Sequence, residues 1–488
     1  MIAQAPIPTP EIALEPLLPE LALCLFGIAG LLYEAFARRS EPLVHLVIGL
    51  LGIALAAATA LWLWGWDGAP TVLAGSLSVD RFGVLARLLL LVVAALGLLL
   101  GHQYFRRSGD APRGEFAPLL LFATVGMTLI VVAADLIVTF LALEILSLSL
   151  YVLTGLTGRR AANEASLKYF LLGAFSSAFF LYGVAMAYGA TGTTKIPALA
   201  TALTAGTAQG LALLGFALLA VGFAFKVSAA PFHMWTPDVY EGAPTPVTAY
   251  MSAATKIAAF AALIRVLDVA FQGLAWDWAP IVWALSAVSI VIGSVLAIAQ
   301  TNIKRMLAYS SIAHAGFILT GLTAPGAQGI RAALFYLVAY AATTLGAFGT
   351  VMYVSGRGEE RTTLRDYAGL GRTHPAAAAL MTLFLLSLAG IPPAAGFIAK
   401  VTVFSAALEA GHWDLVLIGV LASVAAAFFY LRVIVLMYMQ APAEEAGAEA
   451  PAGLTAPVLA VAAAATLALG VFPGLIVDVI REAAVLTW

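Results

Sequence analysis

The sequence predicts an all-α, polytopic membrane protein with about fourteen transmembrane helices, ten of which form two inverted repeats of five. Three observations support this fold class. The 488 residues are 62% apolar and only 10% charged, whereas a soluble domain carries about 25% charged residues. Apolar stretches of about 20 residues, enough to cross a bilayer, recur along the whole chain. Two of these stretches hold proline and glycine where a helix would otherwise continue.

The predicted spans follow one another with short connections. The seventh contains GFAFKVSAAPFHMW and the twelfth SLAGIPPAAGFIAKVTVF. Proline inside a helix removes a backbone hydrogen bond and clashes with the preceding turn. In lipid, such a break persists only where protein or cavity water satisfies the freed groups, so spans 7 and 12 are predicted to be discontinuous. The spans are 16–37, 43–64, 80–101, 116–133, 135–156, 164–190, 208–235, 244–267, 278–299, 305–324, 328–354, 376–407, 414–440 and 453–475.

A weak internal repeat relates spans 4–8 to spans 9–13. LYVLTGLT at 150–157 matches GFILTGLT at 316–323, an offset of 166 residues, and the broken spans occupy corresponding places in the two units. A unit with an odd number of helices must recur in the opposite orientation, which is typical of transporters. The predicted organisation is therefore three N-terminal helices (1–115), a first repeat (116–268), a second repeat (278–440), and span 14 with a tail (441–488).

Basic residues in the connections predict the orientation. Odd-numbered connections hold thirteen Lys and Arg, whereas even-numbered ones with their flanks hold three. This asymmetry places both termini on the periplasmic side of a bacterial inner membrane. The acidic connection with Glu444, Glu445 and Glu449 does not alter this, because Asp and Glu contribute little to the rule. The thirteen are Arg38, Arg39, Arg106, Arg107, Arg113, Arg159, Arg160, Lys304, Arg305, Arg357, Arg361, Arg365 and Arg372, and the three are Arg81, Lys195 and Arg331.

Composition also excludes several classes of protein. A net charge of −2 offers no basic surface for nucleic acid. The single cysteine, Cys24, cannot form an internal disulfide, a Cys-rich zinc site or an iron–sulfur cluster. The chain contains no G-x-G-x-x-G, no P-loop and no zincin-spaced His pair. We therefore expect the chain to carry no cofactor and no metal of its own.

Ionisable residues inside the apolar stretches are the candidate functional groups. Four of the six lysines, Lys168, Lys226, Lys256 and Lys400, lie in predicted spans, and Glu144 lies near the middle of the fifth. Each such group costs roughly 2.5–3.5 kcal/mol at the bilayer centre. Burial disfavours a charged lysine and a nearby carboxylate favours it, so a lysine between these influences can exchange protons near neutral pH. We interpret the set as a proton relay with Glu144 paired to Lys226; the alternative is structural ion pairing.

Three further residues have competing interpretations. Lys168 lies only about a turn and a half into its span, so it either joins the relay or extends to the cytoplasmic surface. His233 follows the first break and His314 lies near Ser310 in the tenth span. Each histidine either links lysines through water, since imidazole both donates and accepts, or is a hydrogen-bonded structural residue. The remaining histidines, at span ends or connections, are expected to be solvated: His45, His102, His374 and His412.

Several motifs resemble a known family. The run FKVSAAPFHMWTPDVYEGAPTPVTAYMSAATK (225–256) resembles the seventh and eighth spans of the subunit N family of respiratory complex I. The segments SLKYFLLGAFSSAFFLYG, QTNIKRMLAYSSIAHAGF, LRDYAGLGR and AGIPPAAGFIAK resemble the same family. These motifs cover roughly 115–440, and the fourteen-span layout extends the similarity to both ends. The PFHMWTPDVYEGAPTP run is the most specific, because it separates subunit N from its sister subunits.

The resemblance implies an antiporter-like membrane-arm subunit of proton-translocating NADH–quinone oxidoreductase. NADH, flavin, iron–sulfur clusters and quinone would then belong to partner subunits, and the partners would include the sister antiporter-like subunits. The family's relay residues fall on Glu144, Lys226, Lys256 and Lys400. Three alternatives stay open: a subunit of a cation/proton antiporter, the membrane part of an energy-coupled hydrogenase, and a structural anchor. The subunit-N-like run disfavours the first two, and four lysines against one clear midspan carboxylate disfavour the third.

Overall fold

The computed structural model describes residues 13–37, 40–107, 114–204, 209–355, 360–442 and 453–487. Some residues used for the predicted orientation lie outside these ranges: Arg38, Arg39, Arg113, Arg357, Glu444, Glu445 and Glu449. Within the described ranges the chain is almost entirely helical, as predicted. The exception is one small antiparallel hairpin that the sequence did not predict, in which β1 (Thr71–Val72) pairs with β2 (Leu77–Ser78).

The long helices coincide closely with predicted spans, whereas the short helices at Ile196–Thr204 and Gly474–Ala483 were not predicted. Nine helices of the described ranges are long and apolar enough to cross a membrane, and α18 with α19, bent by 86°, is a tenth candidate. The protein is therefore an all-helical polytopic membrane protein. The helices up to α10 are α1 (Leu18–Phe36), α2 (Pro42–Trp62), α3 (Arg81–Arg107), α4 (Phe116–Ile130), α5 (Leu136–Gly155), α6 (Arg160–Thr191), α7 (Ile196–Thr204), α8 (Gln209–Val227), α9 (Trp235–Gly242) and α10 (Thr245–Arg265). The others are α11 (Ala275–Ile298), α12 (Ile303–Leu322), α13 (Ala327–Ser355), α14 (Leu370–Thr373), α15 (Pro375–Ala389), α16 (Ala395–Glu409), α17 (Trp413–Met439), α18 (Thr455–Val471) and α19 (Gly474–Ala483).

Local sequence explains where several helices begin and end. The Asp135 side chain accepts a hydrogen bond from the Ile137 amide at the start of α5, and Asn302 caps α12 in the same way. Such caps satisfy amides that have no partner inside the helix. At the other end, Gly390 follows α15 with φ of +82°, a conformation that glycine adopts without steric cost.

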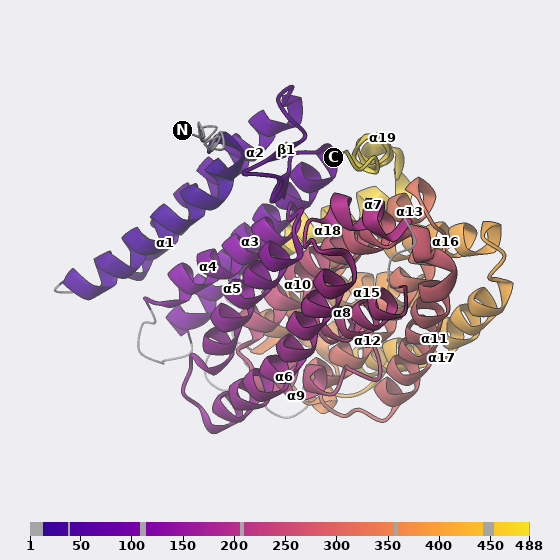
Figure 1. Cartoon of the computed structure of the whole chain (residues 1–488). Helices are drawn as coiled ribbons and strands as arrows, with labels where there is room; N and C mark the ends of the chain where they lie inside the picture. The colour runs from indigo at the N-terminus through magenta and orange to yellow at the C-terminus, as the bar shows by residue number, and fades with distance from the viewer. Residues whose placement is uncertain are drawn as a thin grey trace, which may run out of the picture.

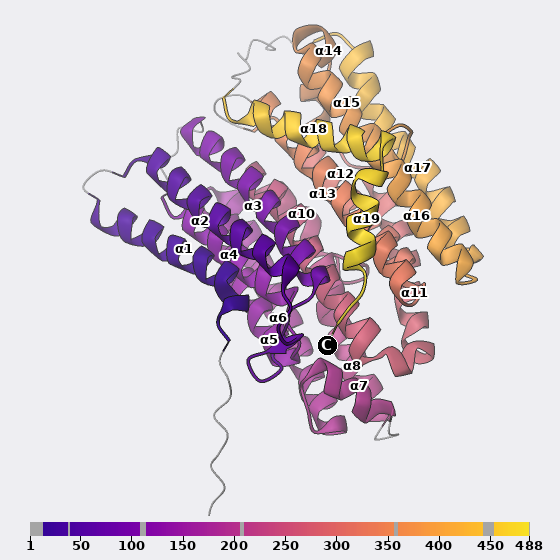
Figure 2. The same cartoon turned by 90° about the horizontal axis from the view of Figure 1, so that it is seen from above.

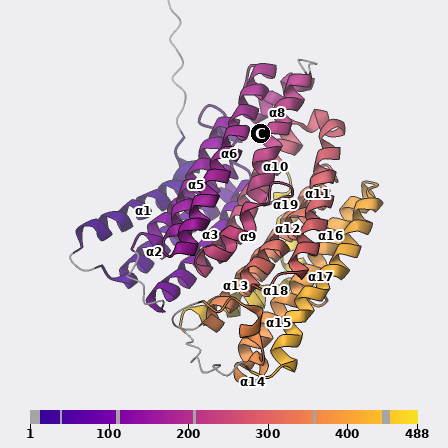
Figure 3. The same cartoon turned by 90° about the horizontal axis from the view of Figure 1, so that it is seen from below.

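The helices form one elongated bundle. The N-terminal helices α1 and α2 lie at one end and α15–α17 at the other, with α10, α12 and α13 between them (Figures 2 and 3). The hairpin, α7 and α19 lie at the same end of the helix axes (Figure 1). Every residue of α10 is buried, from Thr245 to Arg265, whereas α6 and α17 keep exposed apolar faces. The centre of the fold is therefore α10 with α13, and the outer helices face the surroundings.

Two buried ion pairs brace the N-terminal half. The Arg265 guanidinium, at the end of α10, binds both carboxylate oxygens of Asp80 at 2.6 and 2.9 Å. Arg87 on α3 pairs with Glu20 on α1 at 2.9 Å. Both pairs join segments distant in sequence, so each ties separate helices together.

The prediction that the four remaining histidines are solvated is wrong for two of them. His45 and His102 are only 5% and 9% exposed. His45 binds Glu34 at 2.8 Å across the α1–α2 connection. A position near a helix end therefore does not ensure contact with water, because the polar partner can come from the neighbouring helix.

The Asp80–Arg265 pair gives a stability prediction. Asp80→Asn removes the carboxylate that binds two nitrogens of the buried Arg265 guanidinium, and breaking a buried pair destabilises by about 3–5 kcal/mol. We expect a clearly lowered thermal unfolding temperature for the purified protein in mild detergent. Asp478→Asn is the control, because it breaks the exposed Arg481–Asp478 pair and should leave the temperature unchanged. Equal stability of Asp80→Asn and the wild type would contradict this role for the pair.

Candidate functional site: a buried row of lysines at two helix interruptions

Both predicted breaks are present in the structure. Helix α8 ends at Val227, one residue after Lys226, and the next helix begins only at Trp235. Helix α15 ends at Ala389 and α16 begins at Ala395. Each break leaves carbonyls at a helix C-terminus without an intrahelical donor.

A buried lysine binds the carbonyl at each break. Lys256 on α10 donates from Nζ to the Val227 carbonyl at 2.7 Å, and Lys400 on α16 donates to the Ala389 carbonyl at 2.9 Å. The two side chains belong to residues only 1% and 5% exposed. A helix C-terminus favours a positive charge. Each lysine therefore satisfies a free carbonyl, and the helix end in turn stabilises the charged ammonium. Gly390 is required here as well, because a Cβ at that position would lie 2.7 Å from Cδ of Lys400.

Lys226 occupies the end of α8 and faces α5 and α6. Its Nζ donates to the Ser147 hydroxyl at 2.8 Å and to the Tyr169 hydroxyl at 3.4 Å. Glu144, one turn before Ser147 on α5, instead accepts a hydrogen bond from Ser177 on α6. The predicted pairing of Glu144 with Lys226 is thus not a direct contact: Ser147 takes the lysine, while Glu144 lies on the same face of α5.

Hydroxyl and imidazole groups lie between Lys256 and Lys400. The Lys256 Nζ lies 5.8 Å from the Tyr340 ring centroid, and Tyr340 donates to the Ser311 hydroxyl at 2.9 Å. The His314 ring is 5.2 Å from that of Tyr340, and its Nδ1 is 2.7 Å from the Tyr336 hydroxyl.

Phe317 connects His314 to Lys400. The His314 ring also contacts Phe317, over which the Lys400 Nζ lies at 4.7 Å, and Lys400 donates to the Ser423 hydroxyl at 3.1 Å. We call the set Lys226, Lys256, His314 and Lys400, which are buried, together with the partly exposed Glu144, the buried row.

Lys168 and His233 lie outside the buried row. The Lys168 side chain is 42% exposed, and its Nζ lies 2.8 Å from both Glu164 and Asp238. His233 is half-buried in the segment between α8 and α9, and its Nδ1 is buried with no hydrogen-bond partner among the described residues. The structure therefore brings together five of the seven predicted residues and separates these two.

Charged side chains tie α9 to its neighbours. Asp238 binds Arg305 on α12 at 2.6 Å as well as Lys168 on α6, and Glu241 also binds Arg305, at 2.9 Å. Burial would raise the pKa of Asp238, but hydrogen bonds from Lys168 and Arg305 and their positive charges outweigh it and hold the pKa below its ordinary value. A carboxylate with a lowered pKa loses its ion pairs only when the pH falls through that lowered value. The ion pairs of Asp238 are therefore intact at neutral pH.

A buried ion pair also lies at the start of α10. Lys304, which is fully buried, donates to the Ala243 carbonyl at 2.6 Å and to Glu360 at 2.7 Å. Glu360 also accepts from the Thr245 amide at 3.0 Å. Burial raises the pKa of Glu360, but the positive charge of Lys304 and the hydrogen bonds from Lys304 and Thr245 together outweigh it, and the pKa lies below its ordinary value. This pair fixes the start of the helix that carries Lys256.

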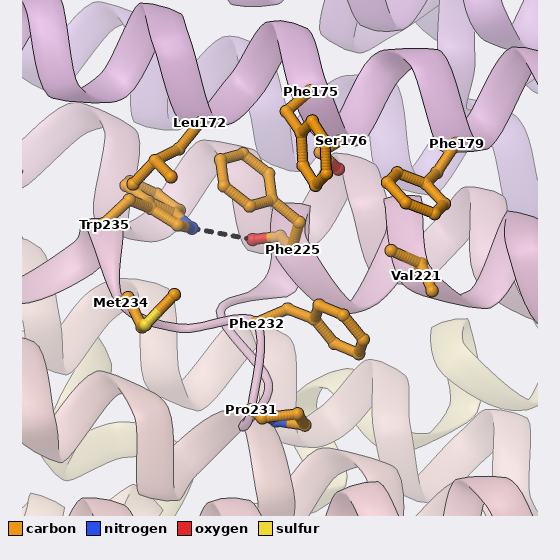
Figure 4. Close-up of a pocket in the computed structure, with 10 residues that line it drawn as sticks. All are labelled: Leu172, Phe175, Ser176, Phe179, Val221, Phe225, Pro231, Phe232, Met234 and Trp235. Atoms are coloured by element: carbon orange, nitrogen blue, oxygen red, sulfur yellow. Dashed lines mark hydrogen bonds between the residues drawn. The ribbon is translucent and has the colours of Figure 1, made fainter.

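An apolar pocket lies on the outer side of the first break (Figure 4). It has a volume of about 370 Å³ between α6 and the segment that follows α8. Phe225 and Trp235 form part of its wall, and the Trp235 indole donates to the Phe225 carbonyl at 2.9 Å. The pocket offers almost no polar groups, and no cluster of three or more metal-ligating side chains occurs in the described part of the chain.

Sequence reasoning missed the hydroxyl side chains of the buried row. Ser147, Tyr169, Tyr336 and Tyr340 come from three helices, and each contacts a lysine, the histidine or another member of the set. Polar residues one turn from a buried charge on the same helix face are the available signal, and this would have identified Ser147 from Glu144. The tyrosines give no such local signal.

Known proteins share the sequence of this chain over most of its length. Residues 133–426 match the family described as NADH:quinone oxidoreductase/Mrp antiporter, TM. Over 481 residues, the chain is 44% identical to NADH-quinone oxidoreductase subunit N of Trichlorobacter lovleyi, covering 97% of both chains. The chain belongs to the subunit N family.

Solved structures of respiratory membrane complexes contain chains with the same fold. A chain of respiratory complex I from Thermus thermophilus, determined with bound aureothin, matches with a TM-score of 0.79 and 37% identity, over 94% of this chain and 98% of that one. A chain of the membrane-bound sulfane sulfur reductase, an archaeal respiratory membrane complex, matches with a TM-score of 0.83 and 28% identity, over 96% of both. The subunit N family therefore shares its fold with other respiratory membrane complexes.

Thiol labelling distinguishes the exposed lysine from the buried row. In a Cys24→Ser background, a cysteine placed by Lys168→Cys should react with a water-soluble maleimide as an exposed thiol does. A cysteine placed by Lys256→Cys should stay unlabelled until the protein is denatured, because that position is buried on all sides. Mass spectrometry of the intact chain measures both. Comparable labelling of the two native proteins would contradict the burial of Lys256.

Proposed function

We propose that this chain is a proton-translocating membrane-arm subunit of an NADH–quinone oxidoreductase of the complex I type. NADH oxidation and quinone reduction take place in partner subunits, which carry the flavin, the iron–sulfur clusters and the quinone. The observation that carries the proposal is the buried row, since four buried ionisable groups inside an apolar bundle, with Glu144 partly buried beside them, are costly unless they are used. Membership of the subunit N family supports the partnership with other membrane-arm subunits.

Protons pass along the buried row in this proposal. Glu144 and Lys226 form the first station, Lys256 receives the proton at the first break, and Lys400 releases it at the second. His314 and the hydroxyl groups beside it connect the two breaks, because imidazole and hydroxyl groups both donate and accept. Lysine suits this task better than arginine, which stays protonated in proteins.

Coupling between the stations is electrostatic. A change of charge at one station alters the stability of the charged form at the next, and the weak screening inside an apolar bundle lets the effect act over several ångströms. Glu144 acts on Lys226 in this way without touching it, because Ser147 holds the ammonium one turn away. Charge movement in a neighbouring subunit can then drive the chain's own proton steps.

Lys168 and His233 keep subsidiary places in the proposal. Lys168 is the water-facing member, since its side chain is partly exposed. His233 lies beside the first break, half-buried between α8 and α9, and is a further proton-exchanging group in the proposal.

The proposed architecture is fourteen spans with spans 4–8 and 9–13 as inverted repeats, in the organisation 1–115, 116–268, 278–440 and 441–488. The two breaks support this repeat, because each one exposes a carbonyl that a lysine binds. The proposed orientation has both termini on the periplasmic side, from the excess of Lys and Arg in odd-numbered connections.

A subunit of a cation/proton antiporter is the second candidate, because the matching family description also names Mrp antiporters. Partners that co-purify with the chain distinguish the two functions. Flavin- and iron–sulfur-bearing partners with NADH–quinone reductase activity indicate the oxidoreductase. Antiporter subunits without redox activity indicate the alternative and leave the relay residues in place.

Substitutions in the first station test the relay. Lys226→Ala should lower NADH-driven proton uptake by inverted membrane vesicles by roughly 100-fold, the lower range of what a positioned proton-transfer group contributes. Glu144→Gln should also impair pumping, because the carboxylate no longer favours a charged Lys226. The amount of assembled complex, measured on native gels, should stay close to that of the wild type.

Lys195→Ala is the matched control, since Lys195 is an exposed lysine outside the buried row. It should assemble and pump normally. Full pumping by a correctly assembled Lys226→Ala or Glu144→Gln enzyme would show that the altered group is not a station of the relay.

A further inference from the structure

The short helix α9 is fixed at its outer face by ion pairs. Asp238 binds Lys168 on α6 and Arg305 on α12 at 2.8 and 2.6 Å, so one carboxylate joins three helices. Glu241, on the next turn, adds a bond to Arg305 and one to Asn302. Lys168 and Arg305 each have a second carboxylate partner, Glu164 and Glu241.

The inner face of α9 reaches the surroundings of Lys226. Trp235, at the first position of α9, is buried and stacks on Tyr169 with a centroid distance of 4.5 Å and an interplanar angle of 7°. The Tyr169 hydroxyl accepts a hydrogen bond from Lys226, whose Nζ also lies 5.5 Å from the same ring. The Trp235 indole binds the Phe225 carbonyl, one residue before Lys226. Trp235 therefore contacts both the partner and the backbone of Lys226.

Helix α9 depends on these contacts for its position. It has only eight residues, and helices of this length are not stable on their own in water. The chain between α8 and α9 is not helical: Ala229 and Ala230 are buried, whereas Met234, directly before α9, is 68% exposed. On its outer face, the ion pairs of Asp238 and Glu241 restrain α9.

We propose that Asp238 is a positioning residue for Lys226: by tying α9 to α6 and α12, it holds Trp235 against Tyr169 and so fixes the partners of the Lys226 ammonium. This proposal rests on the proposed role of Lys226 in proton transfer. Asp238 itself takes no proton in it. Its effect is geometric, because small displacements of a reacting group cause large losses of rate.

Asp238→Asn is the central test, made in the assembled complex. It removes the carboxylate that joins α9 to α6 and one of the two that join α9 to Arg305 on α12, and it leaves Lys168 and Arg305 with a carboxylate partner each, so the fold should be retained. We expect hydrogen–deuterium exchange to increase over residues 235–242 and the maximal pumping rate to fall roughly tenfold, within the loss that a displacement of about 1 Å can cause. The KM values for NADH and quinone should stay unchanged, since those sites lie in partner subunits.

Two companion variants separate positioning from general electrostatics. Asp238→Glu keeps the charge and should restore both exchange protection and pumping. Glu164→Gln is the matched control: it removes the other carboxylate that lies 2.8 Å from Lys168, but this residue lies on α6 itself and does not hold α9. It should leave pumping and exchange at the wild-type level.

The outcomes also separate this proposal from the proposed function. Normal pumping by Lys226→Ala would overturn the relay itself, whatever the exchange of α9. If Lys226→Ala is inactive, the positioning role alone is overturned by any of three results: wild-type pumping by Asp238→Asn, an equal loss in Glu164→Gln, or no restoration by Asp238→Glu.

Discussion

A lysine ammonium bound to a carbonyl freed by a helix interruption is the interaction on which this structure depends. A broken helix in lipid exposes backbone carbonyls that have no water to bind, and a buried ammonium is equally costly without an acceptor. Lys256 at the Val227 carbonyl and Lys400 at the Ala389 carbonyl meet both needs with one hydrogen bond each. The breaks and the lysines are thus mutually dependent, and neither would be stable in the apolar bundle alone.

The packing around the breaks follows from this dependence. Helix α10 carries Lys256 and is buried along its whole length, so its ammonium can be held at a fixed place relative to α8. Near the start of α12, Glu360 binds Lys304 and Asp238 on α9 binds Arg305. The proposed relay therefore lies among helices that buried hydrogen bonds and ion pairs join to one another.

Sequence reasoning identified the helices, both breaks and the lysines, because each leaves a local signal: apolar length, proline in an apolar run, and charge inside it. It missed interactions between distant residues. Asp80 and Arg265 are 185 positions apart and Asp238 and Arg305 are 67 apart, and only the packing of the helices brings them together. For the same reason the sequence paired Glu144 with Lys226 but did not show the hydroxyl that binds the lysine: Ser147, one turn from Glu144 on α5, accepts its hydrogen bond.

Replacement of Lys256 by arginine tests the central claim, that the lysines exchange protons, most directly. Arginine keeps the positive charge and a donor for the Val227 carbonyl, but it does not release its proton at physiological pH. NADH-driven proton uptake by inverted vesicles, normalised to assembled complex, is the measurement. The account predicts an assembled Lys256→Arg complex that does not pump. Pumping at the wild-type rate would contradict it, and would reduce Lys256 to a fixed charge that holds the break.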